Sequence, residues 1–405
     1  MSDQAVDLKR LGPGFWKDPY PVYAKLRAEG PVHRVAIPGR GEGWLVVGYE
    51  EARTALAHPG LAKDWGKGNR EWKALELGDP DAEGRPWGRH MLNADPPDHT
   101  RLRRLVSKEF TPRRIEALRP RVQEITDRLL DALPAEGRFD LMDTLAFPLP
   151  MAVITELLGV PDLDGERFRA WSNLVVAPDL DNPEANSEAF HRLNEYLRDL
   201  IEDKRGRPGD DLLSALIQTR DEDGDRLSGD DLQAMAQLLL IAGHETTVNL
   251  IGNGLLALLR HPRQLAALRA DFSLLDNAVE EMLRYDGPVE GSTLRFAVDP
   301  VEIGGTVIPG GGTLVVVIMA SAHRDPARYE DPDTFDIHRD PGGHLAFGHG
   351  IHYCLGAPLA RMEGRIAIRT LLERCPDLAL DADPCELEWR TGLLMRGVHH
   401  LPLRR

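Results

Sequence analysis

Hydrophobic and polar residues follow different patterns along the 405-residue chain. Val32–Ile37 and Trp44–Gly48 are two short apolar runs joined by the turn-forming residues 38–43, and this arrangement predicts a β-hairpin. From Tyr49 to Val160 the apolar residues recur at helical spacing between prolines and glycines, which predicts a series of helices. Residues 160–186 mix Pro and Asp with apolar residues and are predicted to connect two helices.

A long helix is predicted in the second half of the chain. Its start is marked by Ser228-Gly-Asp-Asp231, a capping box in which the Ser and the Asp can each bond the backbone N–H of the other. The helical pattern continues to about Arg260, so this helix would be roughly 45 Å long. A shorter helix is predicted over Leu274–Tyr285.

The remaining C-terminal part mixes short strands with irregular chain. Strand-like segments are predicted between residues 293 and 318, and an irregular segment rich in Pro, Asp and His follows from 322 to 350. One more helix and a β-like tail complete the pattern. No repeat, low-complexity tract or linker divides the sequence. We therefore predict a single domain over residues 1–405 that is mainly α with a smaller β part.

Composition and charge exclude several classes of protein. The 49 Lys and Arg residues against 65 Asp and Glu residues give a net charge of −16, which disfavours a dedicated nucleic-acid-binding protein. Three cysteines are too few for a disulfide framework. The N-terminal segment lacks the apolar core of a signal peptide, and no apolar run approaches the length of a membrane span. A cytoplasmic protein without a membrane anchor is expected.

The most informative segment is Phe347-Gly-His-Gly-Ile-His-Tyr-Cys-Leu-Gly356, a glycine-rich loop that runs into a predicted helix. Backbone N–H groups and the N-terminus of that helix would stabilise the thiolate form of Cys354. The glycines let the backbone approach a flat ligand closely, because they carry no side chain. A lone cysteine is more often a small buried hydrophobic residue, and Cys375 and Cys385 are interpreted in that way. The surroundings of Cys354 instead indicate a metal-binding thiolate.

The chain resembles the cytochrome P450 family of haem-thiolate enzymes, in particular its soluble bacterial members. The family signature Phe-x-x-Gly-x-x-x-Cys-x-Gly is met by Phe347, Gly350, Cys354 and Gly356, and three further motifs occur in the expected order. The resemblance implies a single triangular, mostly helical domain with haem b (iron protoporphyrin IX) between the long central helix and the helix after the Cys loop. It also implies that Cys354 is the axial ligand of the haem iron and that Phe347 packs near the sulfur.

The second motif is Ala242-Gly-His-Glu-Thr-Thr247, midway along the predicted long helix. Taken alone it is equally well a tolerated irregularity, since Gly and Thr are poor helix formers. The resemblance assigns it to the oxygen-binding groove, in which Ala242 and Gly243 leave room for O2. Glu245 and Thr246 would then be the catalytic acid and alcohol that deliver protons to the oxygen.

The third motif is Glu281-Met-Leu-Arg284, whose charged side chains share one helical face. Taken alone, such a pair is usually a solvated surface bridge that contributes little to stability. By resemblance, it instead pairs with Arg339 and supports the Cys loop without taking part in the reaction.

The fourth motif, in residues 95–103, places His99 and Arg103 four residues apart on one face of a predicted helix. Taken alone, it favours an exposed basic helix. The resemblance implies that both residues bind the haem propionates, and Arg295 and His352 match two further propionate contacts. Carboxylates buried beside a porphyrin need charge-assisted hydrogen-bond donors, which Arg and His supply.

A local basic cluster follows the fourth motif on an otherwise acidic chain. It comprises Arg101, Arg104, Lys108, Arg113 and Arg114. For this cluster, we favour docking of an acidic ferredoxin over simple solvation. The sequence has no dinucleotide-binding or P-loop spacing. Electrons are therefore expected from a separate ferredoxin or flavodoxin with its NAD(P)H-dependent reductase.

The resemblance implies a monomeric monooxygenase that inserts one atom of O2 into a hydrophobic small molecule, by hydroxylation or epoxidation, and releases the other as water. The motifs resemble those of actinobacterial enzymes of secondary metabolism that act on polyketides, macrolides, terpenoids or steroids. One alternative is a haem-thiolate enzyme that couples or rearranges its substrate without inserting oxygen. A second alternative, from another class, is a zinc-binding module. Its ligands would be His344, His349, His352 and Cys354.

The walls of the substrate pocket are expected in segments that the motifs do not determine. The candidate segments are Leu61–Met91, Arg167–Ala177, Leu238–Ala242, Val289–Thr293 and Leu393–Met395. Four of their residues are apolar, as a hydrophobic ligand requires, but they are equally ordinary core residues. These are Leu239, Val289, Leu393 and Leu394.

Overall fold

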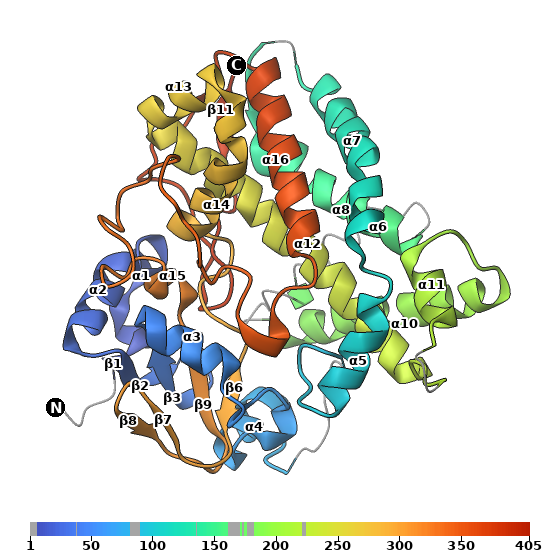
Figure 1. Cartoon of the computed structure of the whole chain (residues 1–405), viewed down its shortest axis with the longest axis vertical. Coiled ribbons are helices and arrows are strands. Elements are labelled where there is room, and N and C mark those ends of the chain that lie inside the picture. The colour runs from blue at the N-terminus through green and yellow to red at the C-terminus, as the bar shows by residue number, and fades with distance from the viewer. Residues whose placement is uncertain are drawn as a thin grey trace. The chain divides into compact units, whose positions relative to one another are not determined.

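The computed structural model describes residues 6–37, 39–81, 90–134, 136–160, 171, 174–175, 182–220 and 224–405 (Figure 1). Its contacts gather into two compact units. The larger unit comprises Met1–Gly84, Thr126–Phe147 and Thr246–Arg405, and the smaller unit comprises Arg85–Ile125 and Pro148–Glu245. Helices dominate both units, and the strands of the described chain lie in the larger one. The described chain is therefore mainly α with a smaller β part, as the sequence pattern predicts.

A six-stranded sheet is the main β element of the larger unit, with the strand order β1-β2-β3-β9-β6-β4. β2 (Val32–Ile37) and β3 (Gly41–Val46) form the predicted antiparallel hairpin. β3 also pairs in parallel with β9 (Thr313–Val317), which pairs antiparallel with β6 (Arg295–Ala297). The edge strands are β1 (Val6–Asp7) and β4 (Leu61–Ala62).

Both faces of this sheet are buried. Successive residues of a strand point to opposite faces, so Val315 of β9 packs in a cluster with side chains of α3 (Tyr49–Ala57). Its neighbour Val316 packs in a second cluster with side chains of α2 (Tyr20–Glu29). A strand that is buried on both faces appears in the sequence as a continuous apolar run, which explains the composition of β9.

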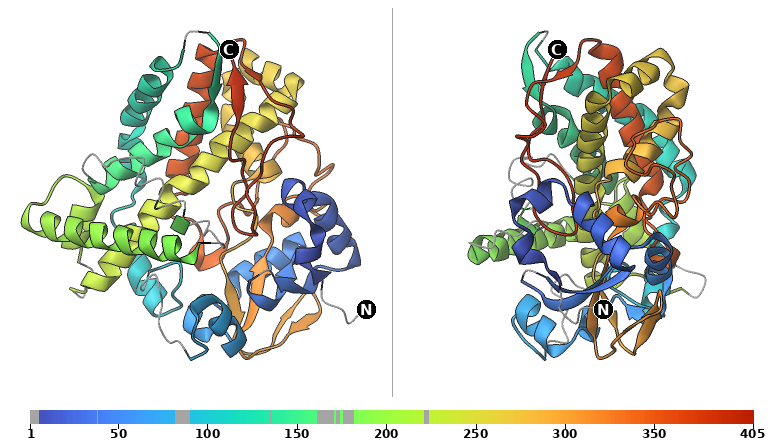
Figure 2. Two further views of the ribbon diagram at one scale, coloured as in Figure 1. Left: turned by 180° about the vertical axis from the view of Figure 1, so that it is seen from behind. Right: turned by 90° about the vertical axis from the view of Figure 1, so that its left-hand side faces the viewer.

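Two smaller sheets and several helices complete the larger unit. β11 (Pro402–Arg404) lies between β10 (Ala379–Leu380) and β5 (Arg138–Asp140) (Figure 2). β7 (Val301–Ile303) pairs with β8 (Thr306–Ile308). The other helices of this unit are α1 (Pro13–Lys17), α4 (Arg70–Leu77), α13 (Pro262–Ala270), α14 (Leu275–Asp286), α15 (Met319–Ala322) and α16 (Ala357–Arg374).

The longest helix is α12 (Gly229–Arg260), which continues without interruption from the smaller unit into the larger one. The predicted capping box begins it: the backbone N–H of Asp231 donates to Ser228 Oγ at 3.0 Å, and the backbone N–H of Ser228 donates to Asp231 Oδ2 at 3.2 Å. The Asp231 carboxylate also accepts from Arg101 at 2.6 Å. The same residue therefore starts the helix and ties it to α5 (Asp98–Ser107).

Helix α8 of the smaller unit packs against the first half of α12. Gly243 of α12 faces Ile154 of α8 (Pro148–Leu158), and a Cβ at position 243 would lie 2.8 Å from Ile154 Cδ1. A glycine is therefore needed here for close helix packing, whatever else this position does. The further helices are α6 (Pro112–Ala117), α10 (Pro183–Gly206) and α11 (Leu212–Gln218), while α7 (Arg119–Asp131) contributes to both units.

Most of the predicted elements are present, with two differences. The helix predicted over Leu274–Tyr285 is α14, shifted by one residue. The region predicted as helical from residue 49 to 160 also contains the short strands β4 and β5, which pair with strands distant in sequence. Most of the predicted connection between residues 160 and 186 lies outside the described residues. Among the described residues, no helix is both long and apolar enough to cross a membrane.

Candidate functional site

The glycine-rich loop presents the Cys354 side chain at an exposed position of the larger unit. The backbone N–H of Cys354 donates to the carbonyl oxygen of Phe347 at 2.9 Å, which closes the loop between the two signature residues. Gly348 and Gly350 have φ values of 75° and 77°. These left-handed conformations strain a residue with a side chain, so the glycines are required by the path of the loop.

The loop is held between two helices. A Cβ at Gly350 would lie 3.0 Å from Ala57, the last residue of α3, so the backbone there touches the helix directly. On the other side, α16 begins at Ala357, three residues after Cys354. A Cβ at Gly356 would lie 3.9 Å from the sulfur. The backbone at the N-terminus of α16 therefore comes into van der Waals contact range of the thiol.

Two of the predicted propionate-binding residues lie in the larger unit. Arg295 begins β6 and is buried, with Nη2 donating to the Leu56 carbonyl at 2.8 Å and Nη1 to the Leu61 carbonyl at 3.5 Å. These bonds fix a cationic side chain inside the protein. His352 is partly exposed in the short 3-10 turn Gly350–His352, two residues before the cysteine.

The other two predicted propionate-binding residues lie in the smaller unit. His99 and Arg103 are both on α5, one turn apart. His99 is buried, and its pKa is lowered from the ordinary value by this burial and by the positive charge of Arg103. A neutral imidazole beside an arginine can donate one hydrogen bond without adding a second buried charge.

Glu245 and Thr246 are consecutive residues of α12. Glu245 is 2% exposed, and its Oε1 lies 3.4 Å from Nε2 of the fully buried His244. His244 Nδ1 lies 2.8 Å from the Leu240 carbonyl, which can only accept, so Nδ1 carries a proton. A favourable contact between Nε2 and Glu245 then requires one proton between them. Ala242, one turn before Thr246, is exposed although its helix neighbours His244 and Glu245 are buried.

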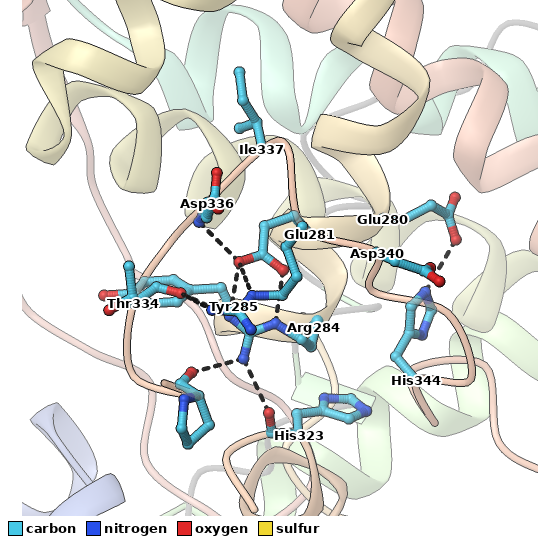
Figure 3. Close-up of polar contacts among 12 residues, drawn as sticks. Glu280, Glu281, Arg284, Tyr285, His323, Thr334, Asp336, Ile337, Asp340 and His344 are labelled. Carbon is cyan, nitrogen blue, oxygen red and sulfur yellow. Dashed lines mark hydrogen bonds and ion pairs between the residues drawn. The ribbon is translucent and has the colours of Figure 1, made fainter. Parts of the chain in front are cut away.

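The third motif makes the contacts that the resemblance implies. Glu281 and Arg284 are both buried and joined by two hydrogen bonds of 2.6 and 2.7 Å (Figure 3). Arg339 Nε lies 3.6 Å from Glu281 Oε1, which completes the predicted trio. Arg284 also donates to three backbone carbonyls of the irregular segment. These are His323 at 3.0 Å, Pro332 at 2.7 Å and Thr334 at 3.0 Å.

The basic cluster is partly used within the chain. Arg101 is paired with Asp231 and Asp225, and Arg114 with Glu109 at 2.6 Å. Lys108 donates to the Arg220 carbonyl at 2.9 Å. Arg104 and Arg113 are exposed. Since charges already paired within the chain are less available to a partner, the structure weakens the case for this cluster as a docking surface.

The zinc-module alternative is not supported. Within the described residues, the one group of three potential ligands close enough to hold a metal ion is Asp140, Asp143 and His400, not the histidines around Cys354. His344, one of the proposed zinc ligands, is bonded to Glu280 at 3.0 Å instead.

Two of the predicted pocket segments lie side by side in the larger unit. Val289 forms a β-bridge with Met395, and the backbone N–H of Glu290 donates to the Leu394 carbonyl at 2.9 Å. A Cβ at Gly291 would lie 2.5 Å from the Leu393 carbonyl, so the two backbones are in direct contact. The predicted segment Arg167–Ala177 lies mostly outside the described residues. So do residues 82–89 of the segment Leu61–Met91.

Sequence reasoning missed Glu280, Arg361 and Glu290, and it considered His344 only as a zinc ligand. Glu280, Arg361 and His344 converge from three segments that are distant in the sequence. Glu290, within the segment Val289–Thr293, is buried and accepts a hydrogen bond from Tyr23. Each of these residues is an ordinary polar residue in its own segment. No local pattern singles it out, because its partners come from elsewhere in the fold.

Comparisons with known proteins agree on one family. The family model described as cytochrome P450 matches residues 55–396. The cytochrome P450 monooxygenase PikC from Streptomyces venezuelae is 57% identical over 405 residues, covering 100% of this chain and 95% of that protein. The 6-deoxyerythronolide B hydroxylase of Saccharopolyspora erythraea is 46% identical and covers 96% of both chains. The tirandamycin C-bound structure of the P450 monooxygenase TamI has a TM-score of 0.90 at 50% identity, over 98% of this chain and 99% of that one.

Proposed function

Because the chain belongs to the cytochrome P450 family and is a P450 monooxygenase, we propose that it hydroxylates or epoxidises a hydrophobic small molecule of the polyketide or macrolide class. One observation carries this proposal. Relatives that match almost the whole chain are named as a hydroxylase of 6-deoxyerythronolide B and as a monooxygenase bound to tirandamycin C. The enzyme would act as a monomer.

The residues present fit the haem-thiolate cofactor of the family, which we propose to be haem b. The chain supplies an exposed thiol beside the N-terminus of an 18-residue helix, in a loop whose glycines let the backbone approach closely. It also supplies a buried Arg295, a buried His99 and Arg103, which are donors that suit carboxylates. Haem, when bound, supplies an iron centre that takes up electrons and activates molecular oxygen.

The roles of the protein residues follow from their chemistry. Cys354 would hold the iron as its axial ligand, with Phe347 beside the sulfur. His99, Arg103, Arg295 and His352 would hold the propionates. Glu245 would hold a proton at Oε1, beside His244 Nε2, and pass it towards the hydroxyl of Thr246 and the oxygen site.

The electron supply is a separate part of the proposal. The sequence has no flavin- or nicotinamide-binding motif. We therefore propose a ferredoxin or flavodoxin with an NAD(P)H-dependent reductase as the donor system.

Apolar segments support a hydrophobic substrate. Leu393, Leu394 and Val289 belong to the two paired segments of the larger unit; Leu394 is 37% exposed and the other two are partly exposed. These apolar side chains would contact an apolar ligand.

An optical titration of the purified haem protein would test this function. The panel would contain macrolides and other polyketides, steroids, terpenoids and fatty acids, and each would be followed by the shift of the haem from low to high spin. We expect a polyketide or macrolide to give the strongest shift and a turnover product heavier by one oxygen atom. A shift with steroids or fatty acids alone would overturn the substrate class. A product without added oxygen would favour the coupling alternative, and a preparation that binds no haem would contradict the cofactor assignment.

A further inference from the structure

Glu280 of α14 binds two side chains that belong to the surroundings of the cysteine loop. Its carboxylate accepts two hydrogen bonds from Arg361 of α16, at 2.7 and 2.8 Å, in a bidentate arrangement. It also accepts from His344 Nε2 at 3.0 Å (Figure 3). The two cationic or donor partners lower the pKa of Glu280 to about 2, despite its partial burial. The carboxylate is therefore ionised at neutral pH.

Arg361 connects this carboxylate to the aromatic residue of the loop. Its guanidinium carbon lies 4.3 Å from the centre of the Phe347 ring, which is a cation–π contact. Phe347 in turn accepts the backbone hydrogen bond from Cys354, at 2.9 Å. One contact therefore separates Arg361 from the segment that carries the sulfur.

His344 fixes the start of the same loop. Its Nδ1 accepts from the backbone N–H of Ala346 at 3.2 Å, so the proton of the neutral ring lies on Nε2 and points to Glu280. The preceding backbone N–H, that of Leu345, donates to His323 Nε2 at 2.8 Å. Arg284 of α14 donates to the carbonyl of His323. The backbone before Phe347 is thus connected to α14 indirectly, through His344 and through His323.

We infer that Glu280, Arg361 and His344 form a positioning network that holds Phe347 and one positive charge beside the cysteine loop, and so tunes the reduction potential of the haem iron. Glu280 is a positioning residue, since it acts through Arg361 and His344 and does not reach the cysteine. The inference rests on the haem-thiolate assignment of the proposed function.

The charges of this network predict in which direction each substitution shifts the reduction potential. Adding an electron to the iron is favoured by nearby positive charge and disfavoured by nearby negative charge. In the intact network, the Glu280 carboxylate offsets the charge of Arg361. The side chains of Glu280 and Arg361 are only 23% and 24% exposed, so water and salt screen them incompletely.

The same two helices carry a second ion pair that serves as a control. Arg365 Nε of α16 lies 2.9 Å from Asp276 Oδ1 of α14, each four residues from its counterpart in the network. Asp276 is 75% exposed and lies one helical turn before Glu280 on α14. Removing it perturbs the helix pair without changing the charge beside Phe347.

The test compares the reduction potentials of the haem-loaded proteins by spectroelectrochemical titration. We expect Glu280→Gln to raise the potential, since it leaves the Arg361 charge without its offset, and Arg361→Gln to lower it. The equilibrium constant for reduction should change about three- to tenfold in each case, tenfold being about 59 mV for a one-electron couple. Asp276→Asn should keep the potential of the unaltered protein.

Several outcomes would overturn the inference. Shifts of the same sign in Glu280→Gln and Arg361→Gln would indicate general loosening of the loop, and equal potentials in all four proteins would show that the network has no influence. A shift in Asp276→Asn as large as that in Glu280→Gln would show that the effect is not specific to the network and would overturn the inference. If no variant and no unaltered protein binds haem, the cofactor assignment of the proposed function fails instead.

A second variant covers the case in which Glu280→Gln does not fold. Arg361→Lys keeps the positive charge but loses the planar group that stacks on Phe347 and bonds Glu280 twice. We expect a potential near that of the unaltered protein, together with a larger fraction of the ferrous carbon monoxide complex in the thiol-ligated form. An unchanged fraction in Arg361→Lys would contradict the positioning part of the inference.

Discussion

Cys354 is the residue on which the cofactor assignment depends, and the chain offers a control for it. Cys354 and Cys385 are both exposed, so the interpretation of Cys385 as a small buried residue was wrong. Only Cys354 lies in the glycine-rich loop before α16. We expect Cys354→Ala to lose the thiolate signature in the spectrum of the ferrous carbon monoxide complex, and with it monooxygenase activity. Cys385→Ala should retain both. Normal hydroxylation by Cys354→Ala would refute its assignment as the axial ligand.

The hydroxyl of Thr246 is predicted to direct protons to the oxygen site. Glu245 precedes Thr246 on α12, and its Oε1 lies 3.4 Å from His244 Nε2. Without the hydroxyl of Thr246, protons would be misdirected, so Thr246→Ala should consume NAD(P)H while releasing hydrogen peroxide instead of product. The measured quantity is product formed per NAD(P)H consumed, and Thr246→Ser should restore it. Unchanged coupling in the alanine variant would remove Thr246 from the relay.

At the scale of elements, the packing of α12 against α8 depends on the absence of a side chain at Gly243. Alanine is the better helix former by about 1 kcal/mol. However, its Cβ would lie 2.8 Å from both Cδ1 and Cγ1 of Ile154, and overpacking of this kind typically costs about 1–3 kcal/mol. We therefore expect Gly243→Ala to lower the free energy of unfolding by about 1 kcal/mol.

A double-mutant cycle with Ile154→Ala would check this prediction, because the two changes should compensate each other in part. Gly252→Ala on the same helix is the matched control: its Cβ would meet the flexible end of Met142, which can move aside. A Gly243→Ala protein more stable than the parent would show that α8 does not limit this position.

Elements that depend on local pattern were predictable from the sequence. The hairpin β2–β3, the capping box of α12 and helix α14 each follow from residues within a few positions of one another. The strands β4 and β5 were missed within a region predicted as helical. Each has two or three residues and exists because of a distant partner strand, so no local period reveals it.

At the scale of the whole molecule, one buried carboxyl links stability to pH. Glu290 is 2% exposed, and burial raises its pKa to about 7 from an ordinary value of 4.5, against the opposing influence of Arg396 and Tyr23. In the unfolded chain, the same group ionises near 4.5. Between these values the folded protein binds more protons than the unfolded one, so stability falls as pH rises.

We therefore expect the free energy of unfolding of the unaltered protein to fall by about 2–3 kcal/mol, relative to that of Glu290→Gln, as the pH rises from about 5 to about 8. The measurement is urea unfolding of the haem-loaded proteins at both pH values. Glu302→Gln, at an exposed position of β7, is the control and should show no such pH-dependent difference. A parallel pH dependence of the parent and Glu290→Gln proteins would show that Glu290 does not titrate in this range.

Some residues of the candidate site were predictable from short motifs, and others are brought together only by the fold. The signature around Cys354, the motif of Glu245 and Thr246, and the Glu281–Arg284 pair were recognisable because their short spacings match the motifs of the family. Arg339 was identified as the partner of that pair, and it lies 3.6 Å from Glu281. The basic cluster was interpreted as a docking surface, but Arg101 and Arg114 are paired within the chain.

The sequence by itself determined the class of fold, the capped long helix and the cysteine loop, because each depends on contacts between residues close in the chain. Only the tertiary structure decided that Glu280, Arg361 and His344 meet beside Phe347, and that Glu290 is buried against Tyr23. The physical reason is that burial and pairing of a polar side chain depend on which distant segments the fold brings against it. The residues next to a carboxylate in the sequence do not reveal whether it is solvated, paired with a cation, or buried and protonated.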